Sequence, residues 1–134
     1  MSKVSIIAAE FNKDLIEKMV GVAVGELERI GIRSPHIVRV PGCYEAPFAA
    51  NILLAKPDVS GLVVLGYIEK GETLHGEVMG HVVHRALVEL QLRFLKPMGL
   101  GIIGPGATKE QAVVRHQNCA KAAVMALERL LNLR

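Results

Sequence analysis

The stretch Gly61-Leu62-Val63-Val64-Leu65-Gly66-Tyr67-Ile68 decides the fold of this chain. It is short and almost continuously apolar, which is typical of a parallel strand that is buried on both faces. Residues 4–9 and 98–103 have the same character, so we expect these three segments to be the central strands of one sheet. Residues 36–40 are interrupted by Arg39, which favours a strand at the edge of that sheet.

Helical segments separate the predicted strands. Apolar residues recur at helical spacing in residues 16–30, 46–54, 78–95 and 108–131. The last segment begins with Thr108-Lys109-Glu110-Gln111, a capping-box pattern, and Gly104-Pro105-Gly106 supplies the turn before it. Short apolar strands that alternate with helices predict an α/β fold, in which helices cover both faces of a doubly wound, four-stranded parallel sheet.

The composition fits one small domain without a nucleic-acid or membrane surface. The 134 residues are 51% hydrophobic, which suits a single core over residues 1–134. A net charge of +3 without a block of Lys or Arg argues against a nucleic-acid partner. Cys43 and Cys119 are too few for a disulfide framework, as is usual in a reducing cytosol. Met1-Ser2-Lys3 leads directly into the first strand without a signal sequence, and no apolar run approaches bilayer length, so we expect a cytoplasmic protein.

The segment Gly71-Glu72-Thr73-Leu74-His75 follows the third predicted strand, and such sheets bind ligands beyond the carboxyl ends of their strands. Gly71 lets the backbone approach a ligand, and Thr73 can cap the next helix, whose free N–H groups suit an anion. His75 would lie in the first helical turn, where the helix dipole disfavours imidazolium and favours a neutral ring that can accept a proton. The alternative is that Thr73 only caps the helix and that His75 packs beside its apolar stripe.

Four motifs, in this order, resemble the lumazine synthase family. They are Phe11-Asn12, Val40-Pro41-Gly42-Cys43-Tyr44-Glu45-Ala46-Pro47, Leu65-Gly66 through Gly71-Glu72-Thr73-Leu74-His75, and Glu110-Gln111-Ala112 leading to Arg115. Gly101-Ile102-Ile103-Gly104-Pro105-Gly106 is similar to the archaeal branch of that family. The resemblance covers nearly the whole chain and implies a flavodoxin-like three-layer sandwich.

The resemblance also implies an enzyme of riboflavin biosynthesis. Its reaction would condense 5-amino-6-(D-ribitylamino)uracil with 3,4-dihydroxy-2-butanone 4-phosphate to 6,7-dimethyl-8-ribityllumazine, with release of phosphate and water. Neither a cofactor nor a metal is implied. The substrate's own amine attacks the ketone, so the protein has to supply orientation, proton transfer and an anchor for the phosphate rather than a covalent nucleophile.

Site residues are implied in the strand-end segments and on the last helix. The implied substrate-binding residues are Phe11, Asn12, Cys43, Tyr44, Glu45, Tyr67, Ile68, Gly71, Glu72, Thr73, Leu100, Arg115 and Lys121. Phe11 would stack on the pyrimidine, Glu45 would accept hydrogen bonds from the ribityl hydroxyls, and His75 would transfer the proton. Arg115 would complete the phosphate site that begins at Gly71. Phe11, Glu45 and Arg115 have plainer alternatives: a core Phe, a solvated first-turn Glu and a surface Arg.

The sequence departs from the family pattern at three points. Leu100 stands where many relatives have Phe, Glu69 adds a negative charge near the phosphate site, and the N-terminal extension of many relatives is missing. Val88 and Leu92 lie away from the core face of their predicted helix, so we expect subunits to associate. The family forms pentamers that can build icosahedral shells with sites between subunits, and Phe11 would then serve a neighbour's site.

Other readings stay open from the residues. Glu77, His81 and His84 have a spacing that mimics metal ligands, but no matching ligand cluster accompanies them, so we expect no metal site. Lys70 or Lys121 would form a Schiff base in an aldolase-like enzyme. A non-catalytic flavin-binding or shell-forming relative and an archaeal riboflavin synthase are further alternatives, and the Gly-Glu-Thr before His75 fits lumazine formation better.

Overall fold

Strands and helices alternate along the chain in the computed structural model, which describes residues 3–133. Met1, Ser2 and Arg134 lie outside the described residues, so the outer bounds of the single domain stay a prediction. The elements in chain order are β1 (Lys3–Ala9), α1 (Lys13–Arg29), β2 (His36–Val40), the short 3-10 helix η1 (Cys43–Glu45), α2 (Ala46–Leu54), β3 (Val59–Glu69), α3 (His75–Phe94), β4 (Met98–Ala107) and α4 (Lys109–Leu131).

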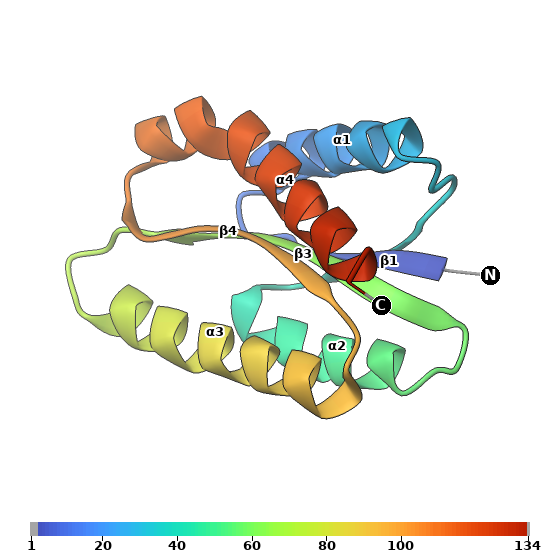
Figure 1. Cartoon of the computed structure of the whole chain (residues 1–134). Helices are drawn as coiled ribbons and strands as arrows, with labels where there is room; N and C mark the ends of the chain where they lie inside the picture. Colours follow the sequence, from blue (N-terminus) through green and yellow to red (C-terminus); the bar gives the residue numbers. More distant parts are fainter. Residues whose placement is uncertain (1–2, 134) are drawn as a thin grey trace.

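The four strands form one parallel sheet between two layers of helices, as predicted (Figure 1). The strand order is β2-β1-β3-β4, with α1 and α4 on one face and α2 and α3 on the other. Neighbouring residues of a strand point to opposite faces. Ile6 therefore packs with the layer of α1 and α4 and Ile7 with that of α2 and α3, and both are fully buried.

The prediction that residues 98–103 form a central strand is wrong, because β4 lies at an edge of the sheet. Its apolar sequence has another cause: α3 and α4 contact it from both sides, so most of its apolar residues are buried or half-buried although it is an edge strand. β2 forms the other edge, as Arg39 indicated. The Arg39 guanidinium reaches Glu17 on α1, with 2.8 Å between Nη2 and Oε1, and this hydrogen bond lowers the pKa of Glu17.

The predicted turn at residues 104–106 is also wrong, because β4 continues through it to Ala107. Gly104 and Gly106 have φ angles of 93° and 91°, a backbone conformation that glycine adopts without strain. The register with β3 shifts there and pairing resumes between Glu69 and Ala107. Glycine thus makes an irregularity in a strand instead of ending it. The capping box at Thr108 is confirmed, since its side chain and that of Gln111 each accept from the other's backbone N–H.

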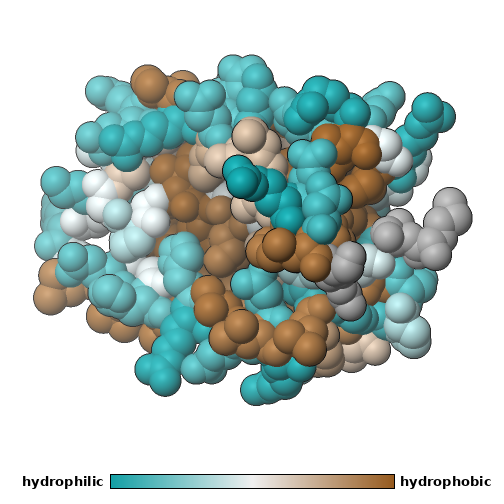
Figure 2. All heavy atoms as spheres, viewed as in Figure 1, coloured by the Kyte–Doolittle hydropathy of each residue, from teal (hydrophilic) through white to brown (hydrophobic). Residues whose placement is uncertain are grey.

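Helix α3 begins at His75, which confirms the first-turn position predicted for this residue, although the apolar spacing indicated the helix only from residue 78. Leu95 ends the helix in the left-handed conformation. Val88 and Leu92 are exposed, as predicted. A groove beside them is lined by Leu92, Leu95, Leu130 and Leu133, where α3 and α4 end. Figure 2 shows apolar atoms gathered between these two helices, next to β4. None of the helices within residues 3–133 is long and apolar enough to cross a membrane.

We expect Gly99→Ala to destabilise the fold, because a Cβ at Gly99 would overlap the backbone carbonyl oxygen of Ala123 where β4 meets α4. The free energy of unfolding should fall by about 1–3 kcal/mol or more, as for other overpacked sites. Gly21→Ala is the matched control, since a Cβ there meets nothing within 4 Å on the exposed side of α1. It should raise the stability by about 0.5–1 kcal/mol through helix propensity. Urea unfolding followed by circular dichroism measures both, and an equal effect of the two substitutions would contradict this packing.

Candidate functional site

A cleft of about 410 Å³ opens at the carboxyl ends of β1, β2 and β3. Its walls come from the segments that follow these strands and from the first turns of α3. The lining residues are Phe11, Pro41, Gly42, Cys43, Tyr44, Glu45, Tyr67, Ile68, Glu69, Gly71, Thr73, His75, Gly76 and Met79. Because parallel strands end at the same edge of a sheet, segments far apart in the sequence meet here.

Most of the predicted site residues line this cleft. Those inside it are Phe11, Cys43, Tyr44, Glu45, Tyr67, Ile68, Gly71, Thr73 and His75. Those outside it are Asn12, Glu72, Leu100, Arg115 and Lys121. Of the lining residues that the sequence did not single out, Met79 lies four positions after His75, a spacing that places both on one side of a helix and that would have indicated it. Gly76 carries no such signal.

His75 is the first residue of α3 and faces Tyr44 across the cleft. The ring centroids are 6.0 Å apart and the planes meet at 63°. The His75 side chain is exposed, which is contrary to the alternative that it packs beside the apolar stripe. A ring in this place is within reach of a ligand that fills the cleft.

The start of α3 leaves backbone donors available. Thr73 accepts a hydrogen bond from the N–H of His75, with 3.3 Å between N and Oγ1, although Leu74 rather than Thr73 holds the capping position. Helical pairing begins where the N–H of Val78 donates to the carbonyl oxygen of Leu74. The N–H of His75 is taken by Thr73, whereas those of Gly76 and Glu77 have no backbone partner within residues 3–133, and Gly76 lines the cleft. Such groups bind anions.

Phe11 and Tyr67 form the aromatic side of the cleft. The Phe11 ring is 51% exposed and lies 6.5 Å, between centroids, from the ring of Tyr67, which is 1% exposed. The Tyr67 hydroxyl donates to the carbonyl oxygen of Ala107 at 2.9 Å. Burial and the nearby Glu69 raise the pKa of Tyr67, so it keeps this proton. The buried ring of Tyr67, which this hydrogen bond holds in place, therefore supports the exposed ring of Phe11.

Cys43 lies beneath the cleft and fixes η1 on the sheet. Its side chain is 3% exposed, and burial raises the pKa of the thiol to about 11. Gly66 of β3 makes room for it, because a Cβ at Gly66 would lie 2.6 Å from the Cys43 sulfur. The thiol is thus an anchor and not a nucleophile at neutral pH. The next two residues, Tyr44 and Glu45, are exposed toward the cleft.

Asn12 and Glu72 lie outside the cleft although they follow the same strands. The Asn12 side chain accepts a hydrogen bond from Lys109, with 2.8 Å between Nζ and Oδ1. Glu72 is exposed in the loop between β3 and α3. Only the neighbours of these residues, Phe11, Gly71 and Thr73, line the cleft.

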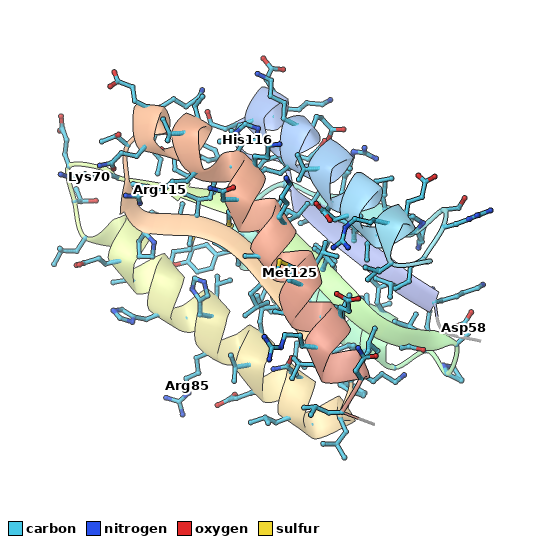
Figure 3. All side chains as sticks on the ribbon, turned by 45° about the horizontal axis from the view of Figure 1, so that its top comes forward. Asp58, Lys70, Arg85, Arg115, His116 and Met125 are labelled. Carbon is cyan, nitrogen blue, oxygen red and sulfur yellow. The ribbon has the colours of Figure 1, made fainter. Side chains whose placement is uncertain are left out.

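Leu100, Arg115 and Lys121 come from β4 and α4. Leu100 is half-buried and packs against the layer of α2 and α3. Arg115 is exposed and lies at the same end of the molecule as Lys70, which precedes α3 (Figure 3). Lys121 pairs with Glu26 of α1 at 3.9 Å. The described chain therefore does not bring these three residues to its own cleft.

The cleft is negatively charged within one chain. Glu45 and Glu69 line it, whereas no Lys or Arg does. No ion pair in residues 3–133 neutralises Glu69. An anionic ligand would depend on backbone N–H groups here, or on a cation from outside the chain.

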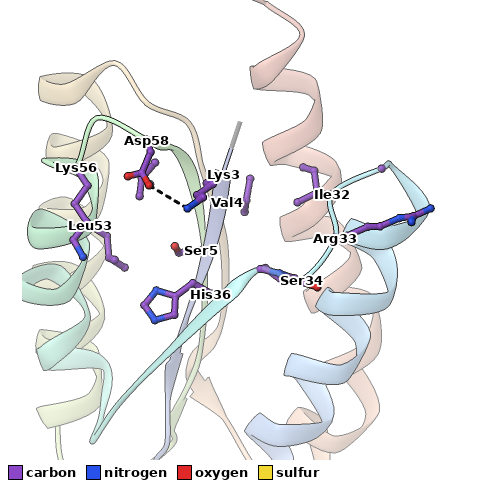
Figure 4. Close-up of a pocket in the computed structure, with 13 residues that line it drawn as sticks. Lys3, Val4, Ser5, Ile32, Arg33, Ser34, His36, Leu53, Lys56 and Asp58 are labelled. Carbon is purple, nitrogen blue, oxygen red and sulfur yellow. Dashed lines mark ion pairs between the residues drawn. The ribbon is translucent and has the colours of Figure 1, made fainter. Parts of the chain in front are cut away.

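A second hollow, of about 750 Å³, lies at the opposite end of the sheet (Figure 4). It is lined by the amino ends of β1, β2 and β3, and the ion pair between Lys3 and Asp58, with 3.3 Å between Nζ and Oδ2, lies on its wall. It contains none of the predicted site residues. Ligands of doubly wound sheets bind at the carboxyl ends of the strands, so the smaller cleft is the candidate site.

Metal ligands do not gather in the described part of the chain. Across residues 3–133 no group of three His, Cys, Asp or Glu side chains is arranged to hold an ion. This includes Glu77, His81 and His84, and the Nδ1 atom of His84 lies 2.8 Å from the carbonyl oxygen of Gly80. That ring is engaged within its own helix.

Comparison with known proteins gives one family. The family model described as 6,7-dimethyl-8-ribityllumazine synthase matches residues 1–134. A relative of that name from Staphylothermus marinus is 40% identical over 132 residues, which are 98% of this chain and 88% of the relative. One from Metallosphaera sedula is 41% identical over 91% of this chain and 81% of the relative. One from Pyrobaculum arsenaticum is 36% identical over 97% of this chain and 87% of the relative.

We expect Gly66→Ala to disturb the floor of the cleft by displacing the Cys43 sulfur. The free energy of unfolding should fall by about 1–3 kcal/mol. Adding Cys43→Ala should restore part of the loss, because the new methyl group then occupies space that the sulfur has left. Cys119→Ala in the same background is the control, since Cys119 is half-buried on α4 and packs with the other layer. Equal recovery by both cysteine substitutions in thermal unfolding would show that Gly66 does not act through Cys43.

Proposed function

The chain belongs to the 6,7-dimethyl-8-ribityllumazine synthase family, and we therefore propose that the cleft binds the two substrates of the family's reaction. In this proposal the residues described above have separate roles in substrate binding and proton transfer. The chain catalyses a transferase step of riboflavin biosynthesis. It condenses 5-amino-6-(D-ribitylamino)uracil with 3,4-dihydroxy-2-butanone 4-phosphate to 6,7-dimethyl-8-ribityllumazine. The family match does not favour a non-catalytic relative, a riboflavin synthase or a Schiff-base enzyme.

One observation supports the division of roles: Phe11, Glu45 and His75 come from three separate segments and line one cleft. The exposed ring of Phe11 stacks on the planar pyrimidine, and Tyr67 and Ile68 bound its edge. Glu45 accepts hydrogen bonds from the ribityl hydroxyls. His75, at the cleft wall, transfers the proton when the amine attacks the ketone.

The phosphate is assigned to the start of α3. Gly71, Thr73 and Gly76 line the cleft there, and the N–H groups of the first turn donate to phosphate oxygens. Glu72 takes part at most through its backbone, because its side chain is exposed outside the cleft. Two carboxylates in the cleft oppose the phosphate, so a cation has to come from elsewhere.

We assign that cation to Arg115 of a neighbouring subunit. Arg115 is exposed and outside the cleft of its own chain, and its planar fork suits phosphate oxygens. Leu100 lies on β4, an edge strand beside exposed apolar side chains, and approaches the pyrimidine of the same neighbour. Lys121 is left out of the phosphate site because its ammonium group pairs with Glu26.

The assembly that this requires is a closed ring. Exposed Val88 and Leu92 and the leucine-lined groove between α3 and α4 supply apolar surface for it. A homopentamer, alone or built into an icosahedral shell, brings the α4 of one subunit to the cleft of the next. We place the protein in the cytoplasm, where its two cysteines stay reduced.

We expect Arg115→Met to reduce kcat/KM more than His75→Gln does. Loss of a charged phosphate donor should cost about 10³-fold, whereas water can partly replace a general base, whose loss should cost about 10²-fold. Steady-state kinetics of lumazine absorbance with both substrates measures this. Arg129→Met, on the same helix and also exposed, should leave the rate unchanged. An equal or reversed ranking of the first two variants would contradict the roles, and no wild-type rate above background would contradict the function.

Mixed assemblies test whether His75 and Arg115 of one site come from two chains. Each single variant should be nearly inactive alone. When His75→Gln and Arg115→Met subunits are co-expressed in equal amounts, about a quarter of the clefts should contain both wild-type residues and activity should return. The same two proteins mixed after separate assembly serve as the control and should stay inactive. No recovery on co-expression would place both residues in a single chain.

A further inference from the structure

Lys109, the first residue of α4, reaches the segment that follows β1. Its Nζ atom donates to the Oδ1 atom of Asn12 at 2.8 Å, and the two residues are 97 positions apart. Neither side chain lines the cleft, but Phe11, the neighbour of Asn12, does. The contact therefore acts on the segment that carries the stacking ring.

Asn12 is placed to cap α1 but does not do so. Its backbone angles, φ 63° and ψ 60°, are left-handed, and its side chain makes no capping hydrogen bond. An Asn in this position usually accepts from the N–H groups of its own helix. Here the side-chain oxygen is used for Lys109 instead, so the stability of α1 does not explain the contact.

Helix α4 does not explain the contact either. Lys109 stands in its first turn, where the positive end of the helix dipole disfavours a cation. The capping box of Thr108 and Gln111, with N to O distances of 2.9 and 3.2 Å, already secures the start of this helix. The contact of the Lys109 ammonium group with Asn12 therefore explains a lysine at this position better than the stability of α4 does.

The contact completes a frame around Phe11. On one side the N–H of Glu10 donates to the carbonyl oxygen of Val40 at 2.8 Å, which ties the segment to β2. On the other side Lys109 holds Asn12. Tyr67, which supports the Phe11 ring, is tied through its hydroxyl to Ala107, two residues before Lys109. The ring and its support are thus both fastened to the junction of β4 and α4.

We propose that Lys109 is a positioning residue for the pyrimidine substrate: through Asn12 it fixes the backbone of Phe11 and the direction of its ring. This rests on the stacking role of Phe11 in the proposed function. The ordered ring offers the substrate a prepared surface, and a free segment would have to be ordered on binding. Lys109 touches neither substrate in this assignment, so its effect falls on the binding of the pyrimidine and spares the phosphate.

The test is steady-state kinetics with each substrate varied in turn. Lys109→Met should raise KM for 5-amino-6-(D-ribitylamino)uracil by about 3- to 10-fold, the scale of one typical net hydrogen bond, with kcat and KM for the butanone phosphate almost unchanged. Lys109→Arg keeps a donor and should recover most of the affinity. Lys18→Met, which removes a lysine from the exposed surface of α1, is the control and should have no effect.

A double substitution shows whether the effect passes through Asn12. Asn12→Gly removes the acceptor and keeps the left-handed backbone accessible. In that background Lys109→Met should cause no further change in KM, whereas independent effects would add and overturn the proposal. A raised KM for the butanone phosphate would overturn it too, by showing a direct charge effect. If the wild type forms lumazine and Lys109→Met has wild-type constants, this inference fails alone; an inactive wild type would mean that the proposed function itself fails.

Discussion

The parallel direction of all four strands is the constraint on which the site depends. It places the carboxyl ends of β1, β2 and β3 at one edge, so Phe11, Tyr44 and His75 meet there without being near in sequence. A second, local constraint sets the depth of the cleft. Gly66 leaves space for the buried Cys43 sulfur, which lets η1 lie close to β3 and present Tyr44 and Glu45 at the surface. A larger residue at position 66 or 43 would push η1, which forms this wall of the cleft, away from the sheet.

The fold could be read from the aliphatic strands because a strand that is buried on both faces needs no polar residue. The same rule misplaced β4: apolarity reports cover by helices, and α3 and α4 cover both faces of this edge strand. The glycines at 104 and 106 were ambiguous for a similar reason, since positive φ angles serve turns and strand irregularities alike. In each case the prediction was wrong because tertiary context, which the local pattern does not contain, decided the outcome.

Prediction of the candidate site from the sequence has the same limit. Segments after strands could be predicted to converge, and Glu45 and His75 do so. The motif resemblance also indicated Leu100 and Arg115. A resemblance assigns residues to a site, but it does not say whether they belong to the site of their own subunit or to the site of a neighbour. The contact of Lys109 with Asn12 carried no sequence signal, because the partners are 97 positions apart and a lysine in a first helical turn is usually solvated.

In the proposed function, the charges of the cleft connect catalysis with assembly. Two carboxylates and no Lys or Arg line it in a single chain. By that proposal the uncharged pyrimidine has stacking and hydrogen-bonding surfaces there, while the phosphate has only backbone N–H groups within the chain. With the proposed Arg115 of a neighbour, the second substrate would be bound well only in an assembled ring. That cation would also face the charge of Glu69, which the chain itself leaves unpaired among its described residues. A glutamate that opposes the phosphate in the monomer would thereby become a partner for the arginine that binds it.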